Sequence, residues 1–255
     1  MERRVLIAGN WKMNKTPEES EAFARSLLSL ESTADIDILI LPPFTSLDRL
    51  GKMLDETGIS LGAQDIHFEP GGAFTGAISA RMILACGCRY VLVGHSECRH
   101  VFGDSDETVE KKLHAALDAE LRPILCIGER LDERRAGDTE SLLSRQLSIA
   151  LADVQSKAMD RITIAYEPVW AIGTGETATP AQAEQACAFV RSWVASRFGD
   201  AFAQRTRILY GGSVKPENAP ALLEEPEIDG ALIGGASLDV EAFAAIIDAV
   251  PGGRR

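Results

Sequence analysis

The chain has 255 residues, of which 45% are hydrophobic, and 26 lysines and arginines against 38 aspartates and glutamates give a formal net charge of −12. This length and apolar content allow a sizeable hydrophobic core. The acidic balance argues against nucleic acid or an anionic membrane surface as a partner, and no apolar run is long enough to span a bilayer.

The cysteines favour a reducing compartment. They are odd in number and form neither a disulfide framework nor a Cys-x-x-Cys motif: Cys86, Cys88, Cys98, Cys126 and Cys187. The start of the chain leads into an apolar run of only about five residues, too short for a signal sequence. We therefore expect a cytoplasmic protein.

Short β-rich runs alternate with helical segments along the chain. The predicted strands are 5–8, 36–41, 59–61, 90–93, 124–127, 162–166, 208–210 and 231–233, and the predicted helices are 17–30, 46–56, 79–85, 106–120, 139–157, 180–197, 216–223 and 239–250. The strands are nearly continuous apolar runs, as in a parallel sheet buried on both faces. Eight β–α units predict an α/β fold with a closed (β/α)8 barrel, forming one domain over residues 1–255. An open doubly wound sheet is the alternative, but it usually has fewer strands at this length.

In such a barrel the active site lies at the carboxyl ends of the strands, where this sequence concentrates polar groups. The residues that follow predicted strands 1, 4, 6, 7 and 8 are Asn10 and Lys12, then His95 and Glu97, then Glu167, then Gly211, Gly212 and Ser213, and finally Gly234 and Gly235. Together they predict a composite site.

The stretch AYEPVWAIGTGET, residues 165–177, predicts a lid directly after an acid or base. Glu167 ends the strand, Pro168 restricts one backbone dihedral, and Gly173 and Gly175 leave theirs free. The alternative is an ordinary solvated loop. The order of carboxylate, proline and glycine-rich tip favours a stiff lid over 168–178 with flexible ends.

The glycine pairs predict a phosphate site. Glycines let the backbone approach closely, and amides at a helix N-terminus favour an anion. We expect Ser213 to precede a helix at Pro216 and Gly234 and Gly235 to precede the last helix, with Gly173 of the lid completing the cradle. Plain turns are the alternative reading of each pair alone.

Lys12 and His95 each have a plain and a functional interpretation. Lys12 could be a solvated lysine, a cation that neutralises oxyanion charge, or a Schiff-base nucleophile as in barrel aldolases. His95 could be structural, or a hydrogen-bond donor kept neutral by a helix N-terminus. His67, His100 and His114 show no metal-ligand spacing, so we expect no metal.

These groups together suit proton transfer next to a carbonyl. Glu167 would abstract the proton, and His95 and Lys12 would stabilise the enediolate oxygen. A closing lid would exclude water from the intermediate.

With these residues assembled, the chain resembles the triosephosphate isomerase family along nearly its whole length. The matching stretches are AGNWKMNK (8–15), LPPF (41–44), GAQD (62–65), GAFTG (72–76), VGHSE (93–97), CIGE (126–129), AYEPVWAIGTG (165–175), YGGSV (210–214) and LIGGASL (232–238). The resemblance implies interconversion of dihydroxyacetone phosphate and D-glyceraldehyde 3-phosphate without metal or organic cofactor.

The resemblance also implies a role for each site residue: Glu167 is the base, His95 the neutral electrophile, and Asn10 and Lys12 are substrate contacts. Glu97 would link lysine and histidine, and Gly173, Ser213, Gly234 and Gly235 would hold the phosphate.

The resemblance also implies a homodimer in which the 64–76 loop inserts into the partner and Thr75 reaches the partner's active site. The family usually has a glutamate at Ala77 and an arginine at Cys98, which pair across the interface. Because this chain lacks both the glutamate and the arginine, the ion pair is absent and no unpaired charge is left at the interface. Two further departures are Asp104, usually glutamate, and Glu176, often lysine. A thiol such as Cys98 beside the interface would be a site of oxidative sensitivity.

Three alternatives remain at this point. A related isomerase could act on a four-carbon ketose phosphate, since the motifs hardly discriminate between chain lengths. A non-catalytic descendant could serve as a binding protein, although the intact Asn10, Lys12, His95, Glu97 and Glu167 argue against it. A Schiff-base aldolase acting through Lys12 is the third.

Overall fold

The computed structural model describes residues 3–30, 36–172 and 176–251. Within these ranges eight parallel strands close into a barrel in the order β1-β2-β3-β4-β5-β6-β7-β8. The strands are β1 (Leu6–Asn10), β2 (Asp37–Leu41), β3 (Ile59–Ala63), β4 (Tyr90–Val93), β5 (Arg122–Ile127), β6 (Thr163–Tyr166), β7 (Arg207–Tyr210) and β8 (Gly230–Ile233). The predicted (β/α)8 barrel is therefore confirmed, and the open sheet is wrong.

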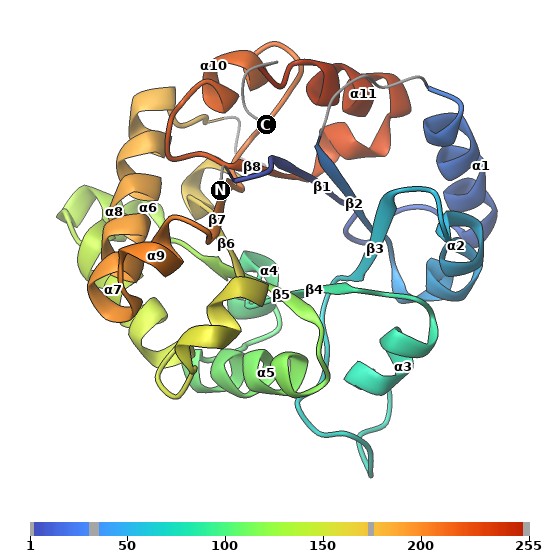
Figure 1. The fold of residues 1–255 in the computed structure, drawn as a ribbon, viewed down its shortest axis with the longest axis horizontal. Coiled ribbons are helices and arrows are strands. Elements are labelled where there is room, and N and C mark those ends of the chain that lie inside the picture. Colours follow the sequence, from blue (N-terminus) through green and yellow to red (C-terminus); the bar gives the residue numbers. More distant parts are fainter. Residues whose placement is uncertain (1–2, 31–35, 173–175, 252–255) are drawn as a thin grey trace.

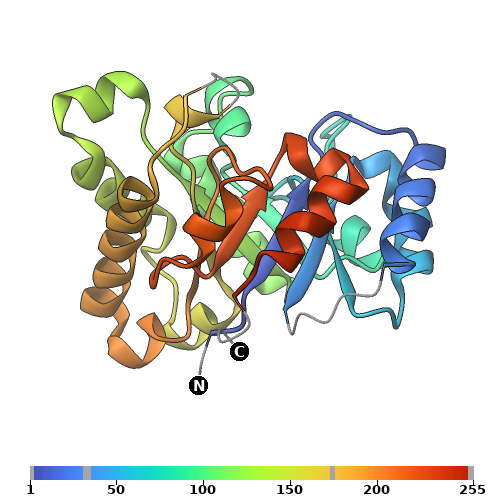
Figure 2. The same ribbon diagram turned by 90° about the horizontal axis from the view of Figure 1, so that it is seen from above.

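Helices surround the strands on the outside (Figures 1 and 2). They are α1 (Pro17–Leu28), α2 (Leu47–Leu54), α3 (Ala80–Ala85), α4 (Ser96–His100), α5 (Asp106–Asp118), α6 (Leu131–Ala136), α7 (Thr139–Ala150), α8 (Pro180–Phe198), α9 (Asp200–Ala203), α10 (Ala219–Leu223) and α11 (Val240–Asp248). Short 3-10 turns lie at Phe44–Ser46, Ser156–Arg161, Val169–Ala171 and Gly235–Leu238. None of the helices in the described ranges is long and apolar enough to cross a membrane.

Two helix starts follow directly from local sequence. Thr16 caps α1 and Thr179 caps α8, each hydrogen-bonded to the backbone three residues on, and Glu19 and Gln182 complete capping boxes. A proline at the first helical position follows each cap, where its missing N–H costs no hydrogen bond.

Two predicted helices are wrong in extent. The segment predicted as 139–157 ends as a helix at Ala150, because the chain turns there to bury Leu151 and Val154 against the core. The segment predicted as 216–223 begins at Ala219, because the backbone N–H of Lys215 donates to the side chain of Asn218 and forms a turn first.

The core has two parts, as the alternation of side chains in a barrel requires. Inside the barrel pack Leu6, Ala8, Leu39, Leu41, Tyr90, Leu92, Ile124, Cys126, Ala165, Leu209 and Leu232. The other strand faces pack against the helices in a second, larger cluster. Because both faces of every strand are covered, the strand ends are the places left for polar chemistry.

Candidate active site

The carboxyl ends of the strands surround a pocket of about 290 Å³. The pocket brings together most of the residues that the sequence selected, which are Asn10, Lys12, His95, Glu167, Ser213, Gly234 and Gly235. Glu97 does not line the pocket and contacts it through Lys12. Gly173 lies outside the described residues. The predicted composite site is thus assembled from five different strands.

Glu167 follows the last residue of β6 and is only 2% exposed. Its Oε1 atom lies 3.1 Å from His95 Nε2, and its Oε2 atom accepts a hydrogen bond of 2.9 Å from the backbone N–H of Ser96. Burial is the largest single effect and raises the pKa of Glu167, but His95, the backbone N–H of Ser96 and Lys12 together hold the pKa of this carboxyl below its ordinary value. The group is therefore ionised at neutral pH, as a general base must be.

His95 caps the first turn of α4. The backbone N–H of Glu97 donates to its Nδ1 atom at 3.2 Å, which requires a lone pair there and puts the proton of a neutral ring on Nε2. Burial is the largest single effect and lowers the pKa of His95, but the Glu167 and Glu97 carboxylates together hold the pKa of His95 above its ordinary value. Because the hydrogen bond favours a neutral ring and the carboxylate opposes it, the neutral His95 stays a prediction.

Lys12 reaches into the pocket from the loop after β1. Its Nζ atom lies 2.7 Å from Glu97 Oε1, and its backbone N–H donates to Asn10 Oδ1 at 3.1 Å. The side-chain nitrogen of Asn10 in turn lies 3.2 Å from His95 Nε2. An ion pair of this kind suits a cation that attracts substrate charge, and it does not suit the nucleophilic amine of a Schiff-base aldolase.

The N-terminal end of the predicted lid is attached to a buried carboxylate that sequence reasoning did not select. Glu129, which follows β5 and is fully buried, accepts hydrogen bonds of 3.0 Å from Trp170 Nε1 and Tyr166 Oη and forms an ion pair with Arg134. The position of Glu129 at the carboxyl end of a strand could have marked it as a site residue from the sequence. Residues 173–175, the predicted tip of the lid, lie outside the described residues.

The glycine pair after β7, Gly211 and Gly212, lies where the backbone packs too closely for a side chain. A Cβ atom at Gly212 would lie 2.2 Å from Tyr210 Oη, and one at Gly211 would lie 2.8 Å from Glu167 Cγ. Each pair precedes a helix as predicted, but α10 begins at Ala219 and not at Pro216, and α11 begins at Val240 after a short 3-10 turn. A 3-10 turn begins at Gly235. The first N–H groups of a helical turn have no partner within that turn, so they can attract an anion on a smaller scale.

Asp65, Cys98 and Asp104 form the group of metal-binding residue types that lies closest together in the described ranges. Lys112 Nζ donates to both carboxylates at 2.7 to 2.8 Å, so an ammonium group already balances their charge. The Asp104 departure is accommodated in this network. Burial and the nearby Asp65 carboxylate raise the pKa of the Cys98 thiol to about 12, which makes it a poor target for oxidants.

Comparison with known proteins agrees with this geometry. The family model described as triosephosphate isomerase matches residues 5–250. Three of the similar relatives named triosephosphate isomerase illustrate the match. The protein from Carboxydothermus hydrogenoformans is 49% identical over 96% of this chain and 98% of its own. The protein from Aquifex aeolicus is 51% identical, and that from Syntrophotalea carbinolica is 50% identical, each over the same shares. The chain therefore belongs to the triosephosphate isomerase family.

Proposed function

We propose that this chain interconverts dihydroxyacetone phosphate and D-glyceraldehyde 3-phosphate by proton transfer through an enediolate, without metal or organic cofactor. It is an aldose–ketose isomerase, as family membership indicates. Glu167 takes the proton from the carbon next to the carbonyl and returns it to the neighbouring carbon. His95 donates a hydrogen bond to the oxygen that becomes negative.

The observation that carries this proposal is the pair formed by Glu167 Oε1 and His95 Nε2, 3.1 Å apart in the same pocket as Lys12. A base and a hydrogen-bond donor at this separation can act on adjacent atoms of one small substrate. The apolar side chains of Ile172, Leu232 and Leu238 line the same pocket and lower its polarity, which strengthens each electrostatic contact.

The other side of the pocket suits the phosphate group. Asn10 at the end of β1 and Lys12 in the loop after it line the pocket together with Ser213, Gly234 and Gly235 from the loops after β7 and β8. A Cβ atom at Gly235 would meet nothing within 4 Å, so the backbone there is open to a ligand. We assign Gly173 of the lid to the same cradle. The four-carbon alternative is not favoured, because the matched relatives are named for the triose phosphate.

We also propose a cytoplasmic homodimer. The segment between β3 and α3 projects beyond the ring of helices in Figure 1. Inside it, His67 stacks on Phe68 with ring centroids 4.4 Å apart and makes a tilted contact with Phe74 at 4.3 Å. Large apolar side chains on the loops after β1 and α4 are exposed, with Met13 at 95% and Phe102 at 78%. A second copy would cover them, and Thr75, which is exposed, would reach the partner's site.

The experiment that tests the reaction compares the wild type with Glu167→Asp on glyceraldehyde 3-phosphate. Moving the carboxylate back by roughly one methylene should lower kcat by about 100-fold. Glu241→Asp, the same change at an exposed position at the start of α11, is the matched control and should leave kcat unchanged. A wild type that turns over a four-carbon phosphate and not the triose would refute the proposal. Equal rates for wild type and Glu167→Asp would refute the role of the base.

A further inference from the structure

Lys12 has a backbone conformation that needs support. Its φ angle is 52°, in the left-handed region that residues with a side chain rarely occupy. Such a conformation persists only where surrounding contacts hold it, and it is concentrated at functional sites. Here it aims the side chain so that Nζ meets Glu97 Oε1 and lines the pocket. The residue that holds this backbone therefore helps to place the cation of the reaction.

Two side chains hold the backbone of Lys12. Asn10 accepts from its N–H, and Gln64 Nε2 donates to its carbonyl oxygen at 2.9 Å. The same nitrogen of Gln64 also donates to the carbonyl of Leu41 at 2.9 Å, a carbonyl that accepts from the backbone N–H of Trp11 as well. Gln64 follows β3, Leu41 ends β2 and Asn10 ends β1, so Gln64 connects the ends of three adjacent strands.

The chemistry of an amide fits this position closely. Both neighbours are carbonyl oxygens, so the side chain there must offer two N–H donors, and the amide nitrogen of glutamine offers two. A glutamate would present an acceptor to two acceptors. A methionine of similar length would offer no donor and would leave the Lys12 carbonyl without this partner.

Gln64 is itself held in place by its neighbour. Asp65 is bonded through both oxygens to Lys112, which also bonds Asp104 in the loop after α4. Gln64 is therefore at a firmly attached base of the 64–76 loop, the segment proposed to dock on the partner. The adjacent residues Gln64 and Asp65 thus do two things: Asp65 attaches the loop, and Gln64 holds the backbone of Lys12.

We propose that Gln64 is a positioning residue for the isomerase reaction, which acts by holding the left-handed backbone of Lys12 so that its ammonium group faces the substrate. This inference rests on the proposed function. Without Gln64, the peptide after Lys12 relaxes toward ordinary backbone angles, and Nζ moves away from its place beside Glu97. Both substrate binding and the chemical step lose the cation, so KM rises and kcat falls together.

The test is a double-mutant cycle between Gln64→Met and Lys12→Met, measured as kcat/KM with glyceraldehyde 3-phosphate. Gln64→Met alone should lose about 100-fold, the loss typical of a misplacement of about 1 Å. In the Lys12→Met background the same change should cost less than about threefold, because the group that Gln64 positions is already gone. Gln204→Met, at an exposed position that bonds Arg3 on the far side of the barrel, is the matched control and should leave kcat/KM unchanged.

Melting temperature and sedimentation at the assay concentration accompany each variant. If Gln64→Met unfolds or dissociates, Gln64→Glu replaces it in the cycle. If neither variant folds as the wild type does, Gln64 has a structural role and the inference is overturned. An unchanged kcat/KM for the single variant would overturn it too, as would an equal loss in both backgrounds. An active wild type with either of these results refutes only the role of Gln64, whereas an inactive wild type refutes the proposed function and this inference with it.

Discussion

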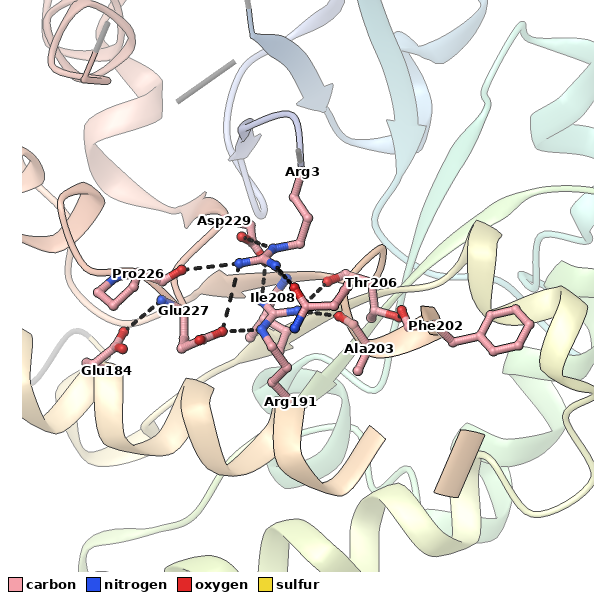
Figure 3. A network of polar contacts seen from close by, with 11 residues as sticks. Arg3, Glu184, Arg191, Phe202, Ala203, Thr206, Ile208, Pro226, Glu227 and Asp229 are labelled. Carbon is pink, nitrogen blue, oxygen red and sulfur yellow. Dashed lines mark hydrogen bonds and ion pairs between the residues drawn. The ribbon is translucent and has the colours of Figure 1, made fainter. Parts of the chain in front are cut away.

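The carboxylate of Asp229 is the centre of a buried ionic network at the end of the barrel opposite the pocket (Figure 3). Asp229 is 4% exposed and lies just before β8. Its Oδ1 atom accepts from Arg3 Nε at 2.6 Å, and its Oδ2 atom accepts from Arg191 Nη2 at 2.5 Å and from the backbone N–H of Ile208 at 2.9 Å. Arg191 also forms an ion pair with Glu227. Two arginines and two carboxylates thus balance in charge.

The change Asp229→Asn keeps the shape of the side chain and removes the charge. The amide nitrogen must then face donors. Among the residues that the structure describes, Arg191, itself only 5% exposed, keeps Glu227 as a charged partner. Breaking a buried ion pair by removing one partner costs about 3–5 kcal/mol. For a chain of this size, in which 1 kcal/mol corresponds to about 2–4 °C, we expect the melting temperature to fall by roughly 6–20 °C.

Equilibrium unfolding in urea at one fixed protein concentration measures this loss. Asp48→Asn is the matched control, because Asp48 pairs with Lys52 on the exposed surface of α2, where such a pair contributes about 0.5 kcal/mol or less. The kcat of the folded Asp229→Asn variant should equal that of the wild type, since the network does not touch the pocket. A loss of stability below about 1 kcal/mol would refute the reasoning, because it would mean that the buried charge of Arg191 is satisfied without Asp229.

Three further predictions concern the lid, the thiols and the surface. Trp170→Phe removes the hydrogen bond to Glu129 and should lower kcat about tenfold with little change in KM. This is the loss expected when one hydrogen bond to a charged group is removed. A wild-type kcat in a steady-state assay would contradict the prediction. The pKa of Cys98 rises from an ordinary value of 9.0 to about 12. At pH 8 this thiol should therefore react with iodoacetamide about 1000-fold more slowly in the folded protein than in urea, as measured by mass spectrometry. Rapid labelling of the folded protein would contradict the burial argument. Phe102→Glu places a charge on an exposed apolar loop and should shift the proposed dimer toward monomer in sedimentation, while unchanged association would exclude this loop from the interface.

Much of the architecture was predictable because it depends on local pattern. Apolar runs mark the strands, and caps such as Thr16 with Glu19 mark helix starts. Once eight β–α units are counted, parallel strands bring Asn10, His95 and Glu167 to one end without further information. The errors came where packing overrides local preference. The helix that begins at Thr139 stops early so that Leu151 can be buried.

The contacts that hold the site in place were not predictable in the same way. Gln64 bonds Lys12 across 52 residues, Glu129 bonds Trp170 across 41, and Ser96 bonds Glu167 across 71. No periodicity or spacing encodes such pairs, because each depends on barrel closure, strand register and the direction of a backbone amide. The sequence by itself therefore determined the family, the fold and the chemical groups. Only the tertiary structure decided which buried polar atoms support them, since a hydrogen bond requires its two atoms within about 3 Å, and the folded chain alone sets that distance.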